Sequence, residues 1–349
     1  MTYTDNKLRA AFSKSVYIHA ASGPLTHNAG CLIEGLLDLG IPVKVNTVEV
    51  TSRPVSMPLK NVDLTPYVSP PYAGLSGYII DISHTNAFVP FDGTEGGRLA
   101  YLNQSDVGIF SRIPDAHLLF VTHDSRFAHK GGTRQPIAFG ISKGLIEATK
   151  SRPAFNTRKR KALRNFRATL SQSVRALLDM SFVPHLEKHM PVDREVYASG
   201  PYIEQMLGSK ICLAYGGDFY APIAQNPWFK KNDPRLAALH DFTRLDAPAL
   251  VQRWDSFRLW ESLAAECLTV HLDFEKYGFA LPQMPKAWEH YAPITLDNIE
   301  GSVTEIMDRE KEWDEIAARG RAWAIEHYAP KPTAARVLSA MLSQPGTTA

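Results

Sequence analysis

The chain has 349 residues, which is long for a single hydrophobic core and predicts two domains of about 150 residues each. Apolar residues make up 44% of the sequence and charged residues 21%, a composition that excludes a disordered or fibrous protein. The formal charge of +2 does not require an anionic partner, and no apolar run approaches the roughly 20 residues of a membrane span.

The N-terminal residues and the cysteines predict a cytoplasmic protein. The first residues lack the apolar core of a secretory signal. Cys31, Cys212 and Cys267 are scattered through apolar runs, which is typical of buried thiols in a reducing compartment. Their spacing does not match any metal-binding pattern, so we expect no metal site.

The first half alternates strand and helix patterns. A strand is expected over 15–19, an amphipathic helix over 28–39 that is closed by Gly40, and a second strand over 43–48. Further strands are expected at 77–82, near 107–110 and at 117–122. Strands separated by helices favour a parallel, doubly wound sheet.

The second half repeats this rhythm after a weak stretch over 130–156. The expected elements are a strand that starts over 162–167, a helix from 171 to about 186, a helix over 202–207, a strand over 210–215 and a helix at 234–239. The tail is helical, and Pro330 and Pro332 are expected to break it before a last helix over 333–343.

Residues 254–273 form the most informative stretch: a turn, an apolar helix and then a buried strand. If Ser256 caps this helix, the amides of Ser256, Phe257 and Arg258 are placed to bind a diphosphate. Glu261 follows on the next turn, where it could accept two ribose hydroxyls. The alternative is a half-buried helix in which Glu261 pairs with Arg258, three residues earlier.

This stretch, RWDSFRLWESLAAECLTVHLDFEKYG, together with ARGRAWAIEHYAPKPTAARVL, resembles the C-terminal half of GT-B glycosyltransferases of the bacterial group 1 and CgeB-like branch. The resemblance covers residues 205–340, while the first half matches only in its strand–helix rhythm. It implies that Glu261 holds the ribose of a nucleotide sugar. Where many relatives carry a second acidic residue, this chain has Arg253, with Asp255 as a candidate replacement. The family's glycine before the strand is Glu266 here, which costs about 1 kcal/mol if the backbone is left-handed there.

The predicted fold is α/β, with two Rossmann-like domains that face each other across a cleft in the GT-B arrangement. We expect an acceptor-side domain over 1–150, a nucleotide-sugar domain over 151–330, and a C-terminal helix within 331–349 that crosses back onto the first domain.

Arginines near the start of the second domain are candidates for a diphosphate clamp. Arg167 and Arg175 are the nearest match to the basic pair of the resembled family, and guanidinium groups meet phosphate oxygens in pairs. Ordinary surface charge is the alternative. The basic run 152–167 is explained either by solvated charge between domains or by contact with a nucleic-acid backbone.

The first domain offers candidates for acceptor chemistry at its strand ends. Gly23 lies in the loop after the first strand and is placed to approach the donor phosphate. His84, and His123 with Asp124, follow later strands, where a histidine could act as the base that deprotonates an acceptor hydroxyl. His19 and His27 border the same loop and fit ordinary structural roles better.

The predicted activity is transfer of a sugar from a nucleotide diphosphate sugar, a UDP-sugar being favoured, to a hydroxyl of a glycan, a small molecule or a modified nucleic-acid base. No metal or further cofactor is required, because helix amides and arginines can stabilise the leaving diphosphate. Two alternatives stay open: a sugar-nucleotide epimerase on the same fold, and a non-enzymatic nucleic-acid binder that uses 152–167.

Overall fold

The computed structural model describes most of the chain, and its elements form two units. The described residues are 3–20, 24–25, 27–50, 58–59, 62–69, 78–83, 98–103, 118–126, 133–166, 173–219 and 251–343. One unit comprises Met1–Glu147 with Ile325–Ala349, and the other comprises Ala148–Ala324.

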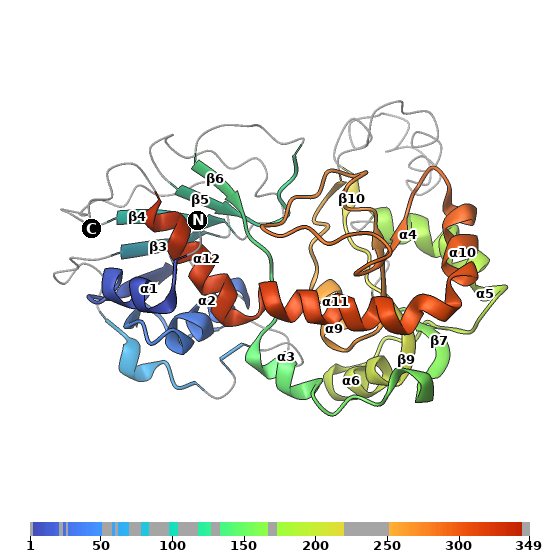
Figure 1. Ribbon diagram of the computed structural model, residues 1–349, viewed down its shortest axis with the longest axis horizontal. Helices are drawn as coiled ribbons and strands as arrows, with labels where there is room; N and C mark the ends of the chain where they lie inside the picture. The colour runs from blue at the N-terminus through green and yellow to red at the C-terminus, as the bar shows by residue number, and fades with distance from the viewer. Residues whose placement is uncertain are drawn as a thin grey trace. The chain divides into compact units, whose positions relative to one another are not determined.

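The first unit contains a parallel six-stranded sheet in the order β2-β1-β3-β4-β5-β6. Figure 1 labels β3 to β6 of this sheet. Its strands are β1 Val16–Ala20, β2 Val43–Val45, β3 Tyr78–Ser83, β4 Arg98–Asn103, β5 Leu118–Val121 and β6 Thr133–Pro136. Because β2 and β3 flank β1 on opposite sides, the strand order reverses at β1. Such a reversal opens a crevice at the carboxyl ends of the strands.

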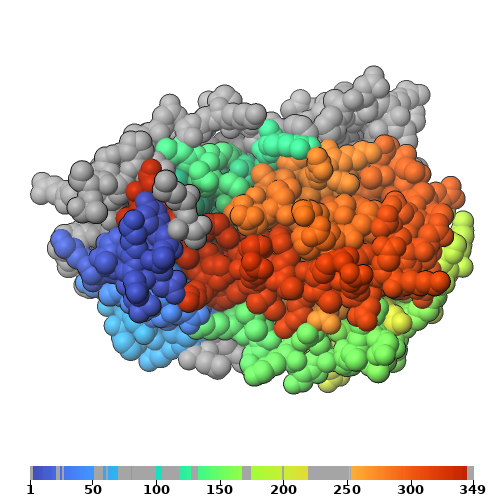
Figure 2. All heavy atoms as spheres, in the orientation of Figure 1, coloured from blue at the N-terminus to red at the C-terminus, as the bar shows by residue number. Residues whose placement is uncertain are grey.

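Helices from both ends of the chain cover this sheet: α1 (Asp5–Ala11), α2 (His27–Asp38) and α12 (Pro330–Leu342). Their apolar faces join β1 to β5 in one buried cluster. Figure 1 shows α12 beside α2, and a Cβ at Gly35 of α2 would lie 2.0 Å from the Pro330 carbonyl oxygen. Only glycine permits that approach. In Figure 2 the blue N-terminal residues adjoin the red C-terminal ones. An ion pair also joins these two segments, with Lys331 Nζ 2.7 Å from Asp5 Oδ2.

The second unit contains a parallel five-stranded sheet in the order β13-β12-β9-β7-β8. Its strands are β7 Lys159–Leu163, β8 Val192–Asp193, β9 Ser209–Leu213, β12 Leu268–Leu272 and β13 Ala292–Ile294, and a separate antiparallel pair is formed by β10 Asp218–Phe219 and β11 Val251–Gln252. Every residue of β12 is buried, as expected for a parallel strand covered on both faces. Here the strand order reverses at β7, which lies between β8 and β9.

The helices of the second unit are α4 Ser173–Met180, α5 Phe182–Glu187, α6 Ser199–Leu207, α9 Phe257–Ala264, α10 Ile299–Asp308 and α11 Trp313–Tyr328. Asn298 starts α10, since its side chain accepts a hydrogen bond from the Gly301 amide at 3.1 Å. The helix α11 runs through the boundary at Ala324, and α3 (Lys143–Ala148) through the boundary at Glu147. Short 3-10 turns occur at Thr65–Tyr67, Phe155–Thr157 and Glu310–Glu312.

The mixed α/β class with parallel sheets is confirmed, and several boundaries are corrected. The expected helix over 171–186 is two helices, α4 and α5, and β7 begins at Lys159 instead of Ala162. The last helix begins at Pro330, not after Pro332, because the first helical position needs no backbone N–H donor. The expected strand near 107–110 and the helix at 234–239 lie outside the described residues.

Candidate functional site

The carboxyl edge of the second sheet, where the strand order reverses, gathers the residues that the sequence singles out. Arg164, Asn165 and Phe166 follow β7, and Ala214 to Gly217 follow β9. In open parallel sheets, ligands bind in the crevice at this point. The amino end of α9 adjoins it, since the Ser256 hydroxyl donates a hydrogen bond to the Ala214 carbonyl at 3.4 Å.

Ser256 stands at the N-cap of α9 with extended backbone (φ −140°, ψ 152°), but its side chain does not cap the helix. The expected side-chain cap is therefore wrong, because the hydroxyl turns to Ala214 instead. The first amides of a helix lack carbonyl partners within it. With the serine directed elsewhere, the amides of this turn keep the polarity that favours an anion.

Glu261 and Arg258 are buried on α9, with 2% and 8% exposure, and they do not pair with each other. The Tyr202 hydroxyl donates to Glu261 Oε2 at 2.9 Å, and Arg258 Nε donates to the Asn165 carbonyl. No ion pair joins Arg258 and Glu261 in the described part of the chain, so the pairing alternative is wrong. Among the described residues, Glu261 Oε1 accepts no hydrogen bond and the Arg258 Nη atoms donate none.

Arg175 of α4 reaches the same edge. Its Nε donates to the Tyr215 carbonyl at 3.3 Å, and the side chain is 8% exposed. A Cβ at Gly216 would lie 3.4 Å from Arg175 Nη2 and 3.5 Å from the Ser256 Cβ. Gly216, which has no side chain, therefore lies between the Arg175 guanidinium group and the amino end of α9.

Phe166 organises the arginines, and sequence reasoning missed it. The guanidinium carbons of Arg164, Arg175 and Arg258 lie 4.3, 5.1 and 5.8 Å from the Phe166 ring centroid. Arg164 is ion-paired with Asp179. Cation–π contacts of this kind hold arginines without using their N–H donors. The sequence signal that could have identified Phe166 is an aromatic residue among arginines directly after a buried strand.

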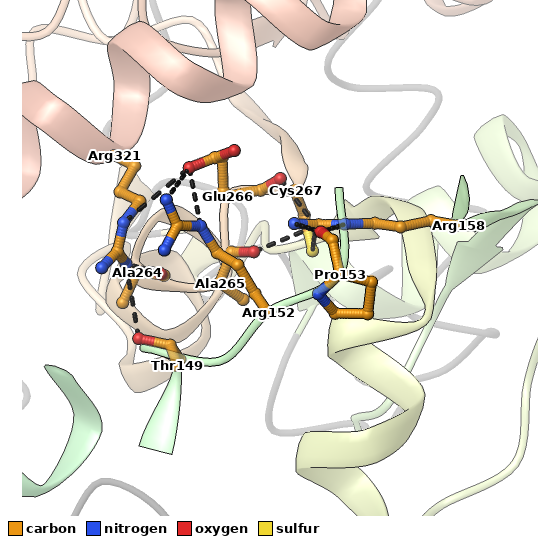
Figure 3. Close-up of polar contacts among 9 residues, drawn as sticks. All are labelled: Thr149, Arg152, Pro153, Arg158, Ala264, Ala265, Glu266, Cys267 and Arg321. Atoms are coloured by element: carbon orange, nitrogen blue, oxygen red, sulfur yellow. Dashed lines mark hydrogen bonds and ion pairs between the residues drawn. The ribbon is translucent and has the colours of Figure 1, made fainter. Parts of the chain in front are cut away.

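The carboxyl end of α9 is held by three arginines, drawn in Figure 3. Arg158 Nη1 donates to the carbonyls of Ala265 (3.0 Å) and Glu266 (2.8 Å), and Arg321 Nη1 donates to that of Ala264. Cations next to the last carbonyls of a helix offset its negative end. Glu266 has φ 58°, the left-handed backbone that the sequence comparison expected at this position.

The Glu266 side chain adds an ion pair to this end of the helix. Arg152 approaches Glu266 Oε2 at 2.6 Å, and Arg321 Nε lies 3.8 Å from the same oxygen (Figure 3). Both ends of α9 are therefore fixed: the carboxyl end by Arg152, Arg158 and Arg321, and the amino end by Ser256 on Ala214.

Much of the basic run 152–167 has partners inside the protein. Besides Arg152, Arg158 and Arg164, two further cations form ion pairs at 2.6 Å, Arg160 with Glu310 and Lys161 with Asp193. Side chains committed to internal partners are poorly placed to follow a phosphate backbone. This pairing weighs against the nucleic-acid interpretation of the run.

Neighbouring polar groups support the loop before α9. Trp254 is fully buried and stacks on Phe279 at 4.7 Å, and Asp255 accepts a hydrogen bond from the Trp260 indole at 2.7 Å. Arg253 has φ 56°, and its Nη1 atom lies 3.1 Å from Asp218 Oδ2. Contacts within the second unit therefore hold this loop in place.

The first-unit candidates lie after β5. His123 is 1% exposed with φ 54°, and its ring meets Phe139 edge-on at 5.4 Å. Asp124 accepts two hydrogen bonds from Arg134, at 2.9 and 2.6 Å, and one from the Ser125 amide. Arg134 therefore balances the Asp124 charge.

The remaining candidates divide into buried and undescribed residues. Burial lowers the pKa of His27 to about 4, which suits a structural histidine. His84, Arg167 and Gly23 lie outside the described residues. No cluster of three metal-ligating side chains occurs among the described residues. No helix in the described part of the chain is long and apolar enough to cross a membrane.

Comparison with known proteins identifies the fold. No protein-family profile and no curated protein sequence matches the chain. Among solved structures it is similar to an alpha-glucosyltransferase in complex with UDP and a 13-mer DNA containing a central A:G mismatch, at 11% identity and TM-score 0.53, over 94% of this chain and 100% of that one.

A second complex of an alpha-glucosyltransferase, with UDP and DNA containing an HMU base, gives TM-score 0.54 at 10% identity, over 94% of this chain and 99% of that one. The similar structures are glycosyltransferases of the GT-B fold. At such low identity the likeness establishes the fold, and the chemistry has to be argued from the site.

Proposed function

We propose that this protein is a glycosyltransferase that moves a sugar from a UDP-sugar to an acceptor hydroxyl. The observation that carries the proposal is the pair of buried side chains on α9, Arg258 and Glu261, whose outer atoms have no partner among the described residues. These atoms are not among the fully enclosed polar atoms that lack a partner, so they remain accessible, and accessible charged groups at the binding edge of a sheet suit a ligand.

The diphosphate is assigned to the space between Arg175, Gly216 and the amino end of α9. When the glycosidic bond breaks, negative charge develops on the leaving UDP, and two arginines with helix amides are suited to stabilise it. Phe166 holds these arginines before the ligand arrives, so less reorganisation is needed. Arg167 and Gly23 keep their predicted phosphate-contact roles as part of this proposal.

Glu261 is assigned to the ribose. Ribose hydroxyls donate hydrogen bonds, and an ionised carboxylate is a strong acceptor for them. The free oxygen of Glu261 lies one turn along α9 from Arg258, which matches a ligand that presents phosphate and ribose in succession. No metal is needed in this scheme, because arginines and amides carry the charge stabilisation; equal turnover with chelator and with added Mn²⁺ is the expected result.

The acceptor base is assigned to His123, with His84 as the second candidate. Asp124 is engaged by Arg134, so we assign it the role of ordering the loop beside His123. The acceptor itself is a hydroxyl of a glycan, a small molecule or a modified nucleobase. DNA containing an HMU base belongs in the acceptor panel, since one similar structure holds that DNA. The three cysteines are free and buried, which fits a cytoplasmic protein.

The test is UDP release from a panel of UDP-sugars, with and without acceptors, alongside the variant Glu261→Ala. We expect acceptor-dependent UDP release by the unmodified protein and at least about a tenfold loss in kcat/KM for the variant. Glu204→Ala, an exposed carboxylate on α6, is the matched control and should retain activity.

Two outcomes would favour the alternatives. Conversion of the donor sugar without an acceptor and without UDP release would identify an epimerase. Salt-sensitive DNA binding that persists in Glu261→Ala, with no UDP release from any donor, would identify a nucleic-acid binder.

A further inference from the structure

Resting on the proposed function, we infer that Tyr202 is a positioning residue that orients the Glu261 carboxylate toward a ribose and thereby selects ribonucleotide over 2′-deoxyribonucleotide donors. The two side chains come from different elements, α6 and α9, and are 59 positions apart in sequence. Tyr202 is 5% exposed and Glu261 2%, so their hydrogen bond is sheltered from water.

The two carboxylate oxygens of Glu261 have different roles. The Tyr202 hydroxyl lies 2.9 Å from Oε2 and donates a hydrogen bond that holds this oxygen. Oε1 accepts no hydrogen bond in the described part of the chain. One oxygen is therefore held by the protein, and the other is available to a hydroxyl of the ligand.

Tyr202 also keeps Glu261 away from a competing partner. Arg258 stands three residues earlier on the same helix, a spacing at which a carboxylate and a guanidinium normally meet. Because Tyr202 draws Glu261 toward α6, and Asn165 and Phe166 hold Arg258, both charged groups keep unused atoms. Without the phenol, the carboxylate is free to turn to Arg258, and both groups are lost to the ligand.

The phenol suits this role because it remains a donor. Burial raises the pKa of Tyr202 well above its ordinary value, and the charge of Glu261 acts in the same direction. The hydroxyl therefore keeps its proton throughout the working pH range and donates it to the carboxylate. A hydrogen bond to a carboxylate in a sheltered site is stronger than one between neutral groups.

The experiment measures the affinities of UDP and 2′-deoxy-UDP by titration calorimetry. The unmodified protein should bind UDP about tenfold more tightly than 2′-deoxy-UDP. In Tyr202→Phe this ratio should fall to about two or less, because only UDP loses the hydrogen bond to the 2′-hydroxyl, whereas any loss of the Arg258 contact weakens both ligands alike. A merely structural role would weaken both ligands equally and leave the ratio unchanged, which would overturn the inference.

Two variants complete the design. Tyr277→Phe removes another buried hydroxyl of the same unit, one that accepts from the Leu296 amide at 2.7 Å, and should keep the ratio of the unmodified protein. Glu261→Gln retains Tyr202 but removes the carboxylate charge, and its preference for UDP over 2′-deoxy-UDP should disappear. If Tyr202→Phe does not fold, the inference is still overturned when Glu261→Gln keeps the preference of the unmodified protein for UDP over 2′-deoxy-UDP.

The outcomes separate this inference from the proposed function. If the unmodified protein transfers sugar from UDP-sugars but binds UDP and 2′-deoxy-UDP alike, the assignment of Tyr202 is wrong and the transferase activity stands. If it neither binds UDP nor releases it from any UDP-sugar, both proposals are wrong.

Discussion

At the scale of single residues, Gly216 gives the most direct test of the proposed diphosphate position. A Cβ at this position would lie 3.4 Å from Arg175 Nη2 and 3.5 Å from the Arg253 carbonyl oxygen, which are ordinary contacts. Gly216→Ala should therefore fold with a thermal stability close to that of the unmodified protein. The added methyl group occupies the space assigned to phosphate oxygens, so UDP affinity should fall by about tenfold or more, as measured by calorimetry.

The matched control for Gly216→Ala is Gly200→Ala in α6, where an added Cβ meets nothing within 4 Å. That variant should keep its UDP affinity. If Gly216→Ala binds UDP as tightly as the control, the diphosphate does not lie between Arg175 and α9.

Sequence alone reached only part of this site. Glu261 could be selected as a candidate from the sequence because the helix and strand around it have a strong local pattern and a family resemblance. Tyr202, Phe166 and Gly216 were not, because their roles depend on contacts between elements far apart in the chain. Arg258 was predicted for its amide, whereas the structure draws attention to its buried guanidinium group.

At the scale of elements, the carboxyl end of α9 offers a matched pair of variants, Glu266→Gly and Glu266→Ala. Both remove the carboxylate that contacts Arg152, so they differ only in backbone freedom at φ 58°. Glycine adopts this conformation without strain, and we expect the glycine variant to be more stable than the alanine variant by about 1 kcal/mol. Urea unfolding measures the difference, and equal midpoints would show that this backbone is not strained.

Elements with continuous apolar patterns were the predictable ones. The expected helix over 28–39 corresponds to α2, and the expected strand over 210–215 to β9. The strand β4, Arg98–Asn103, was not expected, because four apolar residues between polar ends give too short a pattern to distinguish from a loop. The start of α12 was misplaced because proline favours a first helical turn as well as ending one.

At the scale of the whole molecule, the close approach of α2 to α12 ties the C-terminal segment to the first unit. Gly35→Ala would place a Cβ 2.0 Å from the Pro330 carbonyl oxygen and 2.7 Å from the Ala334 Cβ. Because backbone cannot move aside cheaply, we expect a loss of about 2 kcal/mol or more in the free energy of unfolding. Circular dichroism during urea unfolding measures it, and an unchanged midpoint would show that α12 does not pack on α2 in solution.

Acid stability is the second property of the whole molecule that the structure predicts, and the two units should differ. Burial lowers the pKa of His27 in the first unit and of His271 in the second to about 4. A buried neutral histidine binds fewer protons than the unfolded chain, so stability is complete above 6.5, the ordinary value, and is lost as pH falls toward 4. Each histidine contributes a loss of about 1 kcal/mol per pH unit in this window.

Glu34 opposes this loss in the first unit. Burial raises its pKa, so its protonation in the folded state favours folding as the pH falls. The second unit should therefore unfold at a higher pH than the first. All six tryptophans lie within 148–324, so tryptophan fluorescence reports the second unit, while circular dichroism reports both. As the pH is lowered, we expect the fluorescence transition to come before the later part of the dichroism transition. His271→Gln should shift the midpoint of the fluorescence transition to lower pH. If the two transitions coincide and His271→Gln does not shift them, burial of this histidine does not set acid stability.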